Sequence, residues 1–242
     1  MLPVSHSKNL PFVSVIIAAR NEENNLPELL DDLINQEYPL NKFEIIIVND
    51  RSSDSTPEIL KNASDNYAFI KTININKKSK FMTPKKNAVN EGIKSSKGEI
   101  ILATDADCRM GALWIASMAY SLMNKNGIII GYSEISDIKE SYFEKYQKLD
   151  FLAILIANAG ASGWNQYWSG TGQNLAYYKK DYFEIGGFDP VKSKISGDDM
   201  YLVQSISNIK RGYTHIDPNS FVKTKAMSTI KDFINQRIRW SS

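Results

Sequence analysis

Two carboxylates, Asp105 and Asp107, stand two residues apart directly after an apolar run at residues 100–103. The run predicts a buried strand, and carboxylates with this spacing can both lean toward one point beyond the edge of its sheet. Two hard oxygen ligands on one side of a divalent cation leave its other side open to phosphate oxygens. Because this motif is weak evidence alone, its meaning depends on the elements around it.

The first half of the chain alternates between strand and helix patterns. Strands are predicted at residues 12–19, 43–48, 68–75 and 99–103, with helices between them ending near residues 36, 63 and 93. This alternation predicts βαβ units and a parallel sheet with ligands at the C-terminal ends of its strands. We therefore expect an α/β fold whose mostly parallel, Rossmann-like central sheet is flanked by helices.

Polar residues follow three of the predicted strands: Arg20, Asn21 and Glu22, then Asn49 and Asp50, then Asp105 and Asp107. Three strand ends that deliver polar groups to one rim are typical of an α/β ligand site. The alternative is that these residues are polar only because loops are exposed. The first half alone does not separate the two interpretations.

The second half adds motifs of its own. They are a helical stretch at 142–159, a glycine-rich loop at 170–174, a strand at 174–178, a helix from 179, Gly-Gly-Phe-Asp-Pro at 186–190, a helix opened by Gly-Asp-Asp at 197–199 and ending near 209, and a last helix from about 228. Asp198 and Asp199 are caps of their helix or catalytic carboxylates. The tryptophan-rich segment 162–168 either lines a ligand groove or is a packed loop.

Composition excludes several classes of function. The 242 residues are 43% hydrophobic, enough to bury the core of one large α/β domain or two small ones. A net charge of +2 argues against a nucleic-acid binder with a basic surface. One cysteine, Cys108, rules out an intrachain disulfide, and two histidines are too few for a histidine-based metal site.

Taken in order, these motifs resemble the family-2 glycosyltransferases, which are inverting enzymes of the GT-A fold with a nucleotide-sugar donor. The matching segments are VSVIIAARNEE, VNDRSSDST, KKNAVNEG, ATDADC, GTGQNLAY, GGFD, SGDDMYL and QRIRW. The resemblance implies a single GT-A domain with a nucleotide-sugar-binding half, 1–110, and an acceptor-binding and catalytic-base half, 111–242. It also implies an enzyme of the hexosyltransferase type, associated with membranes and with cell-wall or polysaccharide biosynthesis.

The resemblance assigns roles on the donor side. Ala19, Arg20 and Glu22 would form the rim for the nucleotide base and ribose, and Asp50 would accept a hydrogen bond from the uracil ring. UDP is therefore favoured over GDP.

Lys85 would lie near the donor diphosphate, and its spacing to Asn90 favours it over Lys86. Asp107 and Asp105 would form the Mn²⁺ or Mg²⁺ motif, with Asp107 the direct ligand and Asp105 closer to the ribose.

On the acceptor side, the resemblance implies that Asp199, with Asp198 beside it, provides the general base. The start of the helix is expected to keep the Asp199 carboxylate ionised. The acceptor residues implied are Gly170, Thr171, Gly172, Asn174, Gln236, Arg239 and Trp240. Glycines there would let the backbone approach a sugar closely. Arg239 and Trp240 have a simpler alternative, a cation–π pair on the surface.

The chain stops two residues after Trp240, inside the last predicted helix. We expect the natural protein to continue into membrane helices, with this domain at the cytoplasmic face of the membrane and a glycan or lipid-linked acceptor. The expected partners are a nucleotide-sugar donor, that acceptor and the membrane, but no nucleic acid.

Two other functions remain open. A catalytically silent nucleotide-sugar or glycan-binding module would be expected to lack an intact base or metal motif. A nucleotidyltransferase would need a glycine-rich, basic phosphate loop after the first strand, where this chain has the acidic segment 20–23. The donor sugar, the acceptor, and processive or single transfer stay undetermined.

Overall fold

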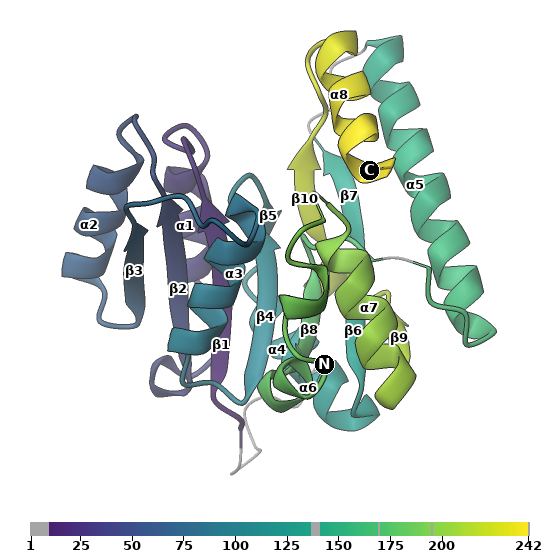
Figure 1. Cartoon of the computed structure of the whole chain (residues 1–242), viewed down its shortest axis with the longest axis horizontal. Helices are drawn as coiled ribbons and strands as arrows, with labels where there is room; N and C mark the ends of the chain where they lie inside the picture. Colours follow the sequence, from purple (N-terminus) through teal and green to yellow (C-terminus); the bar gives the residue numbers. More distant parts are fainter. Residues whose placement is uncertain (1–9, 137–140, 169, 195, 242) are drawn as a thin grey trace.

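The computed structural model describes residues 10–136, 141–168, 170–194 and 196–241, without the side chains of residues 239–241. A seven-stranded sheet in the order β3-β2-β1-β4-β8-β6-β9 forms the centre (Figure 1). Its strands are β1 Val13–Ala19, β2 Phe43–Asp50, β3 Ile70–Ile75, β4 Ile100–Asp105, β6 Ile128–Gly131, β8 Leu175–Tyr178 and β9 Gly212–His215. All neighbours pair in parallel except β8, which is antiparallel to β4 and β6. The predicted α/β fold with a mostly parallel sheet is confirmed.

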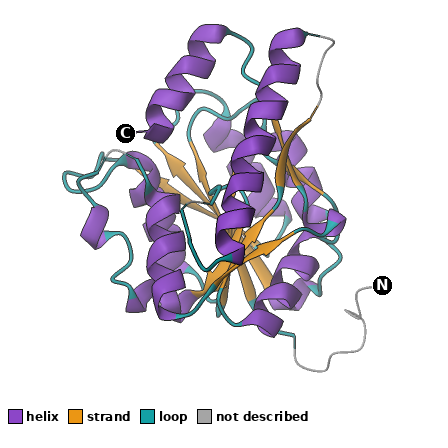
Figure 2. Cartoon of the chain, turned by 90° about the vertical axis from the view of Figure 1, so that its right-hand side faces the viewer, coloured by secondary structure: helices purple, strands orange, loops and turns teal. Residues whose placement is uncertain are grey.

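Both faces of the sheet are buried because its strands are apolar on both sides. In β1, Val15 and Ile17 contribute to one core and Ile16 to the other. Helices α1 Leu26–Ile34, α2 Thr56–Asn66 and α4 Trp114–Lys125 cover the first face, and α3 Pro84–Ser95, α6 Lys179–Glu184 and α7 Asp198–Ile209 cover the second. Figure 2 shows helices on both sides of the strands. This two-sided burial is the usual environment of a parallel sheet.

Helix α3 packs unusually closely on the sheet. A Cβ atom at Gly92 would lie 2.7 Å from Cγ2 of Ile16, so only glycine allows this approach. The buried side of α3 also carries two polar side chains, Lys86 and Asn90. Because α3 leads into β4, its first turn with Lys85 lies at the sheet edge where the parallel strands end.

A smaller sheet and a pair of long helices complete the second half. The sheet has the order β5-β10-β7, with β5 Arg109–Met110, β7 Ser133–Ser136 and β10 Val222–Lys225. Helices α5 Tyr142–Gly163 and α8 Ile230–Ser241 lie side by side, and α8 stands away from the central sheet (Figure 1). The C-terminal end of α5 reaches β9, where Ser162 Oγ lies 2.9 Å from Thr214 Oγ1. Phe233 packs edge-on against Phe143, and Arg237 pairs with Asp150. Among the helices that the structure describes, none combines the length and apolar character needed to cross a bilayer.

The structure contains elements that the sequence did not predict, most of them in the second half: α4, β5, β6, β7, β9, β10 and three short 3-10 helices at Leu40–Lys42, Asp189–Val191 and Pro218–Ser220. Helix α4 is buried on most of its surface, so it shows little amphipathic contrast. The added strands are two to four residues long, too short for a clear alternating pattern.

Candidate active site

The loops after β1 and β2 are joined by hydrogen bonds between them. The amide of Asn21 donates to Ser52 Oγ at 3.0 Å, and its side-chain oxygen accepts from the Ser53 amide at 2.9 Å. The Glu23 amide donates to Asp54 Oδ2 at 3.1 Å. Asn21 adopts a positive φ of 56°, a conformation that asparagine tolerates better than most residues. The two strand ends therefore form one cross-linked rim.

Asp50 lies buried in this rim, at the end of β2. Its carboxylate accepts two hydrogen bonds from Arg51, at 2.8 Å from Nε and 2.9 Å from Nη2. Arg20, which is exposed, approaches the same carboxylate at 3.9 Å. Ala19 is buried beside it and offers a ligand little besides its backbone.

Glu22, Asp105 and Asp107 form a group of mutually repelling carboxylates at the ends of β1 and β4. Burial raises the pKa of Glu22, the Asn25 amide opposes this, and the charges of Asp107 and Asp105 raise it further. Burial and then the charge of Asp105 likewise raise the pKa of Asp107. Thr224 from β10 donates to Asp107 Oδ2 at 3.5 Å. A cation placed here would relieve this repulsion.

The described residues include no group of three or more His, Cys, Asp or Glu side chains arranged to hold a metal ion by themselves. A divalent ion at Asp107 would therefore need oxygens from a ligand or water to complete its shell. That matches the way Mg²⁺ is held in phosphate chemistry, through one or two carboxylates plus phosphate oxygens. The residues present thus fit a metal that is shared with a diphosphate.

Lys85, rather than Lys86, reaches the carboxylates. Its Nζ lies 2.8 Å from Asp105 Oδ1. Burial lowers the pKa of Lys85, but the charges of Asp105, Asp199 and Asp198 outweigh burial and leave that pKa above its usual value. Lys85 therefore stands between the end of β4 and the start of α7, and links the two halves of the site.

Asp199 has a strongly shifted pKa. The pKa of its carboxyl is raised to about 7, mainly by burial and also by the charges of Asp198 and Asp105, while the charge of Lys85 opposes the rise. The helix start was predicted to keep the Asp199 carboxylate ionised, but the pKa of this carboxyl is raised instead, because desolvation and two neighbouring carboxylates outweigh the helix dipole. A carboxyl with this pKa is well matched to proton transfer near neutral pH.

The loop at 170–172 packs against the Asp199 carboxylate. A Cβ at Gly172 would lie 2.2 Å from Asp199 Oδ1, and the Gly172 backbone forms a hydrogen bond to the carboxylate. A Cβ at Gly170 would lie 2.8 Å from Val203 of α7. Thr171 Oγ1 lies 3.3 Å from Ser133 Oγ. Both glycines thus let this loop approach α7 closely.

Asn174 does not meet the prediction that it contacts an acceptor. It is fully buried, and its Oδ1 accepts from Trp114 Nε1 at 3.0 Å. Its Nδ2 donates to the carbonyls of Tyr132 and Ser220 at 2.9 and 2.8 Å. With both ends of the amide engaged by protein groups, Asn174 joins β8 to its surroundings and has no face open to a ligand.

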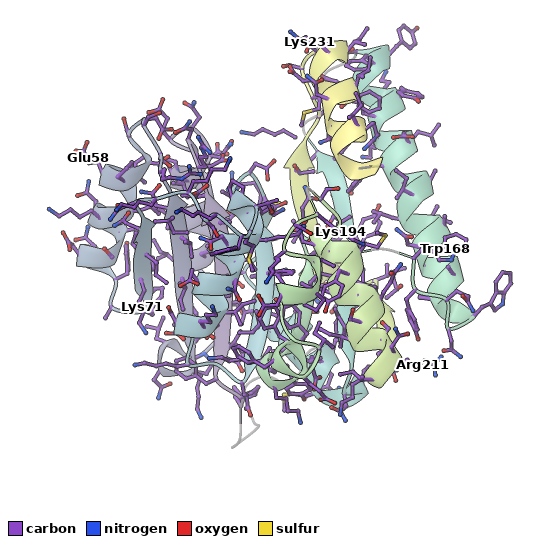
Figure 3. All side chains as sticks on the ribbon, in the orientation of Figure 1. Glu58, Lys71, Trp168, Lys194, Arg211 and Lys231 are labelled. Atoms are coloured by element: carbon purple, nitrogen blue, oxygen red, sulfur yellow. The ribbon has the colours of Figure 1, made fainter. Side chains whose placement is uncertain are left out.

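The remaining predicted acceptor residues lie on α8, apart from the central sheet (Figure 1). Gln236 accepts a hydrogen bond from Arg237 at 3.4 Å. The side chains of Arg239 and Trp240 lie outside the described part of the structure. In the segment after α5, Trp164 and Trp168 are 84% and 57% exposed, so the packed-loop interpretation is wrong for both. Figure 3 labels Trp168 at the outer side of the molecule.

Two features of the site were missed from sequence. One is the pair of hydrogen bonds from Arg51 to the Asp50 carboxylate, which the adjacency of the two residues in the chain could have suggested. The other is the burial of Lys86, which shares the inner face of α3 with Asn90 and Ile93 at helical spacing. A shallow hollow at the outer edge of the sheet, lined in part by Pro57 and Thr72, contains none of the residues discussed above.

Comparison with known proteins places this arrangement in a family. The profile described as "Glycosyl transferase family 2" matches residues 14–197. "Probable glycosyltransferase YdaM" from Bacillus subtilis (strain 168) is 30% identical over 239 residues, covering 97% of this chain and 55% of that protein. "Beta-monoglucosyldiacylglycerol synthase" from Trichormus variabilis is 32% identical over 140 residues, covering 57% of this chain and 30% of that protein. The chain thus spans about half, or less, of the length of these relatives.

A solved structure shows the same fold. The mannosyltransferase PcManGT from Pyrobaculum calidifontis, in complex with GDP-Man and Mn²⁺, aligns with a TM-score of 0.75 at 21% identity, covering 97% of this chain and 62% of that one. The profile covers more than half of the chain, and YdaM matches nearly all of it. This chain therefore belongs to glycosyl transferase family 2.

Proposed function

We propose that this domain transfers a sugar from a nucleotide-sugar donor to an acceptor hydroxyl, with inversion at the anomeric carbon. One observation carries the proposal: Asp199, with a pKa of about 7, faces the ion pair of Lys85 and Asp105 at the sheet edge where the parallel strands end. The charges of Lys85 and Asp105 both shift the pKa of Asp199, which supports a proposed base and a proposed cation beside one reaction centre. Inverting transfer needs both groups, because the acceptor attacks from the side opposite the leaving group.

In the proposed reaction, Asp199 accepts the proton of the acceptor hydroxyl. The acceptor oxygen forms its bond to the anomeric carbon as the bond from that carbon to the diphosphate oxygen breaks. The electron pair of the broken bond goes to the departing nucleoside diphosphate. The Gly172 backbone holds the Asp199 carboxylate in one orientation, and Asp198 beside it favours the protonated form.

The leaving group is stabilised on the opposite side. Lys85 supplies a positive charge near the diphosphate, although it pairs with Asp105 in the absence of a ligand. Asp107, with Asp105 as the second carboxylate, would hold Mn²⁺ or Mg²⁺. When bound, the cation supplies further positive charge for the diphosphate oxygens. Glu22 borders this group and contributes to its negative potential.

The rim of the first half would bind the nucleotide. Asp50 would accept from a ring nitrogen of the base, Arg20 and the Ala19 backbone would border the base, and Asp105 would approach the ribose. The family resemblance favours UDP. Because the Pyrobaculum mannosyltransferase structure contains GDP-Man, GDP is the competitor to test.

We also infer that the outer side of α5 and α8 lies against the cytoplasmic face of a membrane. Exposed apolar residues recur at helical spacing on both helices: Tyr142, Tyr146, Leu149 and Ile156 on α5, and Ile230, Ile234 and Ile238 on α8. Lys145 lies over the Tyr142 ring, and Lys231 lies near the free end of the pair (Figure 3). Apolar stripes with flanking lysines suit a surface of anionic lipid. The diacylglycerol in the name of one relative makes a lipid-linked acceptor a natural candidate.

The first experiment is a thermal melt with UDP or GDP, each with Mn²⁺, Mg²⁺ or EDTA. A ligand at about 100 times its dissociation constant stabilises the folded state by roughly 2.7 kcal/mol. We expect a shift with UDP that EDTA abolishes, followed by release of UDP from one member of a UDP-sugar panel. Binding without turnover of any donor would favour the silent binding module. No shift with either nucleotide would refute the donor site.

Membrane contact is tested separately, by sedimentation with vesicles that contain anionic phospholipid. Ile234→Glu places a charge on the exposed stripe of α8 and should reduce the bound fraction several-fold. Leu40→Glu alters an equally exposed apolar residue on the first half and should have no effect. Equal binding of the two variants would refute the membrane assignment without touching the transfer reaction.

A further inference from the structure

The two adjacent lysines that open α3 have different environments. Lys85 is 46% exposed and pairs with Asp105, as described above. Lys86 is fully buried, and its Nζ donates to the carbonyls of Lys194 and Ser196 at 2.6 and 3.2 Å. Hydrogen bonds from a charged donor in a buried setting are stronger than neutral ones. Lys86 therefore binds the backbone of a segment more than a hundred residues away in the sequence.

The segment that Lys86 holds leads directly into the proposed base. Gly197 follows Ser196, adopts a positive φ of 79° and forms the N-cap of α7. Asp198 and Asp199 are the first two residues of that helix. Figure 3 shows Lys194 near the middle of the molecule, beside the start of α7. A shift of the carbonyls at 194 and 196 would thus move the start of α7 and the carboxylate of Asp199.

Helix α3, which carries Lys86, is seated firmly enough on the central sheet to hold the segment before α7 in place. The close contact of Gly92 with Ile16 seats α3 directly on the central sheet. A second buried polar residue of α3, Asn90, accepts from the Tyr182 hydroxyl at 3.0 Å. The inner face of α3 therefore contacts α6 through Asn90 and the segment before α7 through Lys86, and the Lys86 contact is the one nearer to Asp199 in the sequence.

We propose that Lys86 is a positioning residue that fixes the start of α7, and through it the Asp199 carboxylate, relative to the central sheet. Lys86 acts on the backbone at 194 and 196 and, being fully buried, does not touch a substrate. The inference rests on the proposed function only in naming Asp199 as the base. It assigns to the second lysine of the K-K-N-A-V-N-E-G segment a task different from that of the first.

The test compares Lys86→Met with Lys94→Met. Methionine keeps most of the length and removes the charge and the donors, while Lys94 lies on the same helix, half exposed, and pairs only with Glu91 at 3.4 Å. In hydrogen–deuterium exchange, we expect Lys86→Met to speed exchange of the amides at 197–201 at least tenfold and to leave β1 and β4 unchanged. Lys94→Met should match the unaltered protein throughout.

The kinetic readout separates positioning from donor binding. With the UDP-sugar selected by the donor screen, Lys86→Met should lower kcat on the order of 10²-fold, as a misplaced catalytic group does. The donor KM and the UDP-induced melting shift should stay within about twofold. Lys86→Arg keeps the charge and the donors and should recover part of the lost kcat. An unchanged kcat, or KM and kcat that worsen together, would overturn the proposal.

The outcomes distinguish this inference from the proposed function. If no donor is turned over by the unaltered protein, the function fails, yet exchange at 197–201 still reports whether Lys86 holds α7. If Lys86→Met does not fold, Lys86→Gln carries the same exchange and kinetic measurements, because its shorter, uncharged side chain cannot reach both carbonyls. Unaltered exchange at 197–201 in the folded glutamine variant, together with normal kcat, would refute the positioning role.

Discussion

The two halves of the site are built in different ways. In the first half, the polar residues follow adjacent strands of a buried sheet, and pairing in β1 sets Ala18 opposite Asp105 and Ala19 opposite Asn49. In the second half, Asp199 stands at the start of a helix and depends on the backbone of Gly172 and on the segment that Lys86 holds. Sheet register therefore positions the proposed donor rim, whereas contacts between distant segments position the proposed base.

This difference predicts unequal tolerance to change. The rim loops share several hydrogen bonds, so the loss of one leaves the others, at a cost of about 1 kcal/mol. The Asp199 carboxylate is more sensitive to its surroundings, because a single carbon added at Gly172 would overlap it. Substitutions around Asp199 should therefore cost more activity than comparable substitutions around Asp50.

The largest effect is expected from Asp199→Asn, which removes the base and keeps the shape of the side chain. The transfer rate should fall about 10²–10⁴-fold, the usual contribution of a general base, while UDP binding changes by less than about twofold. Rapid-quench or coupled assays of UDP release would measure the first quantity and calorimetry the second. Asp65→Asn, an exposed change on α2, serves as the control. Near-normal transfer by Asp199→Asn would remove this residue from the mechanism.

Asp199→Asn is also predicted to change how the free energy of unfolding depends on pH. A folded-state pKa of about 7 against an ordinary 3.8 means that ionising Asp199 disfavours the folded state. This cost is absent below pH 3.8, grows as pH rises and is complete above about pH 7. Asp199→Asn should therefore gain stability relative to the unaltered protein as pH rises from 5 to 8, as followed by urea unfolding. A constant difference across that range would contradict the raised pKa.

Gly172→Ala should give the next largest effect, on the order of 10²-fold in kcat, because the new methyl group displaces the Asp199 carboxylate. Gly160→Ala on α5 is the matched control, since a Cβ there meets no atom within 4 Å. UDP binding should be unaffected by either change. Equal activity of the two variants would show that the loop does not position the base.

An effect of similar size is expected from pH alone. Because Asp199 must be deprotonated to act as a base, kcat/KM should rise about tenfold per pH unit below pH 7 and flatten above it. The residual activity of Asp199→Asn should lack this rise. A profile of kcat/KM between pH 5 and 9 at constant metal concentration would measure both. The same rise in the asparagine variant would assign the titration to another group.

The sequence predicted the first half of the fold well because its evidence is local. Each strand from β1 to β4 carries its own apolar run, and the polar residues that follow it need only the general rule for parallel sheets. Asp50 and Asp105 were placed in this way. The motif spacing that favoured Lys85 over Lys86 also agrees with the contact to Asp105.

The second half was harder to predict because its evidence lies in contacts between distant segments. The pKa of Asp199 depends on burial under a loop 27 residues earlier in the chain, and only the nearby helix start was visible locally. Asn174 was assigned to the acceptor from the resemblance of its loop. Its actual partners, Trp114 and Ser220, are 60 and 46 residues away, so the local sequence did not reveal them. Helix α4 carries no amphipathic pattern because both of its sides are largely buried.

The smallest effect is expected in the first half, from Arg51→Gln. Arg51 donates two hydrogen bonds to the Asp50 carboxylate, and the Arg51 and Asp50 side chains are 23% and 7% exposed. The register of β2 should hold Asp50 in place without Arg51. UDP affinity, measured by calorimetry, should therefore fall no more than about fivefold. Arg211→Gln, far from the rim at the start of β9, is the control (Figure 3).

A much larger loss from Arg51→Gln would reverse the contrast between the halves. A loss near a hundredfold in UDP affinity, with normal folding, would mean that Asp50 depends on one partner as strictly as Asp199 depends on Gly172. The register of β2 would then place the backbone of Asp50 at the rim without fixing the position of its side chain. The small loss expected here, beside a hundredfold loss of kcat in Gly172→Ala, would instead support alignment of the proposed donor residues by strand pairing, while the proposed base relies on close contacts with distant segments.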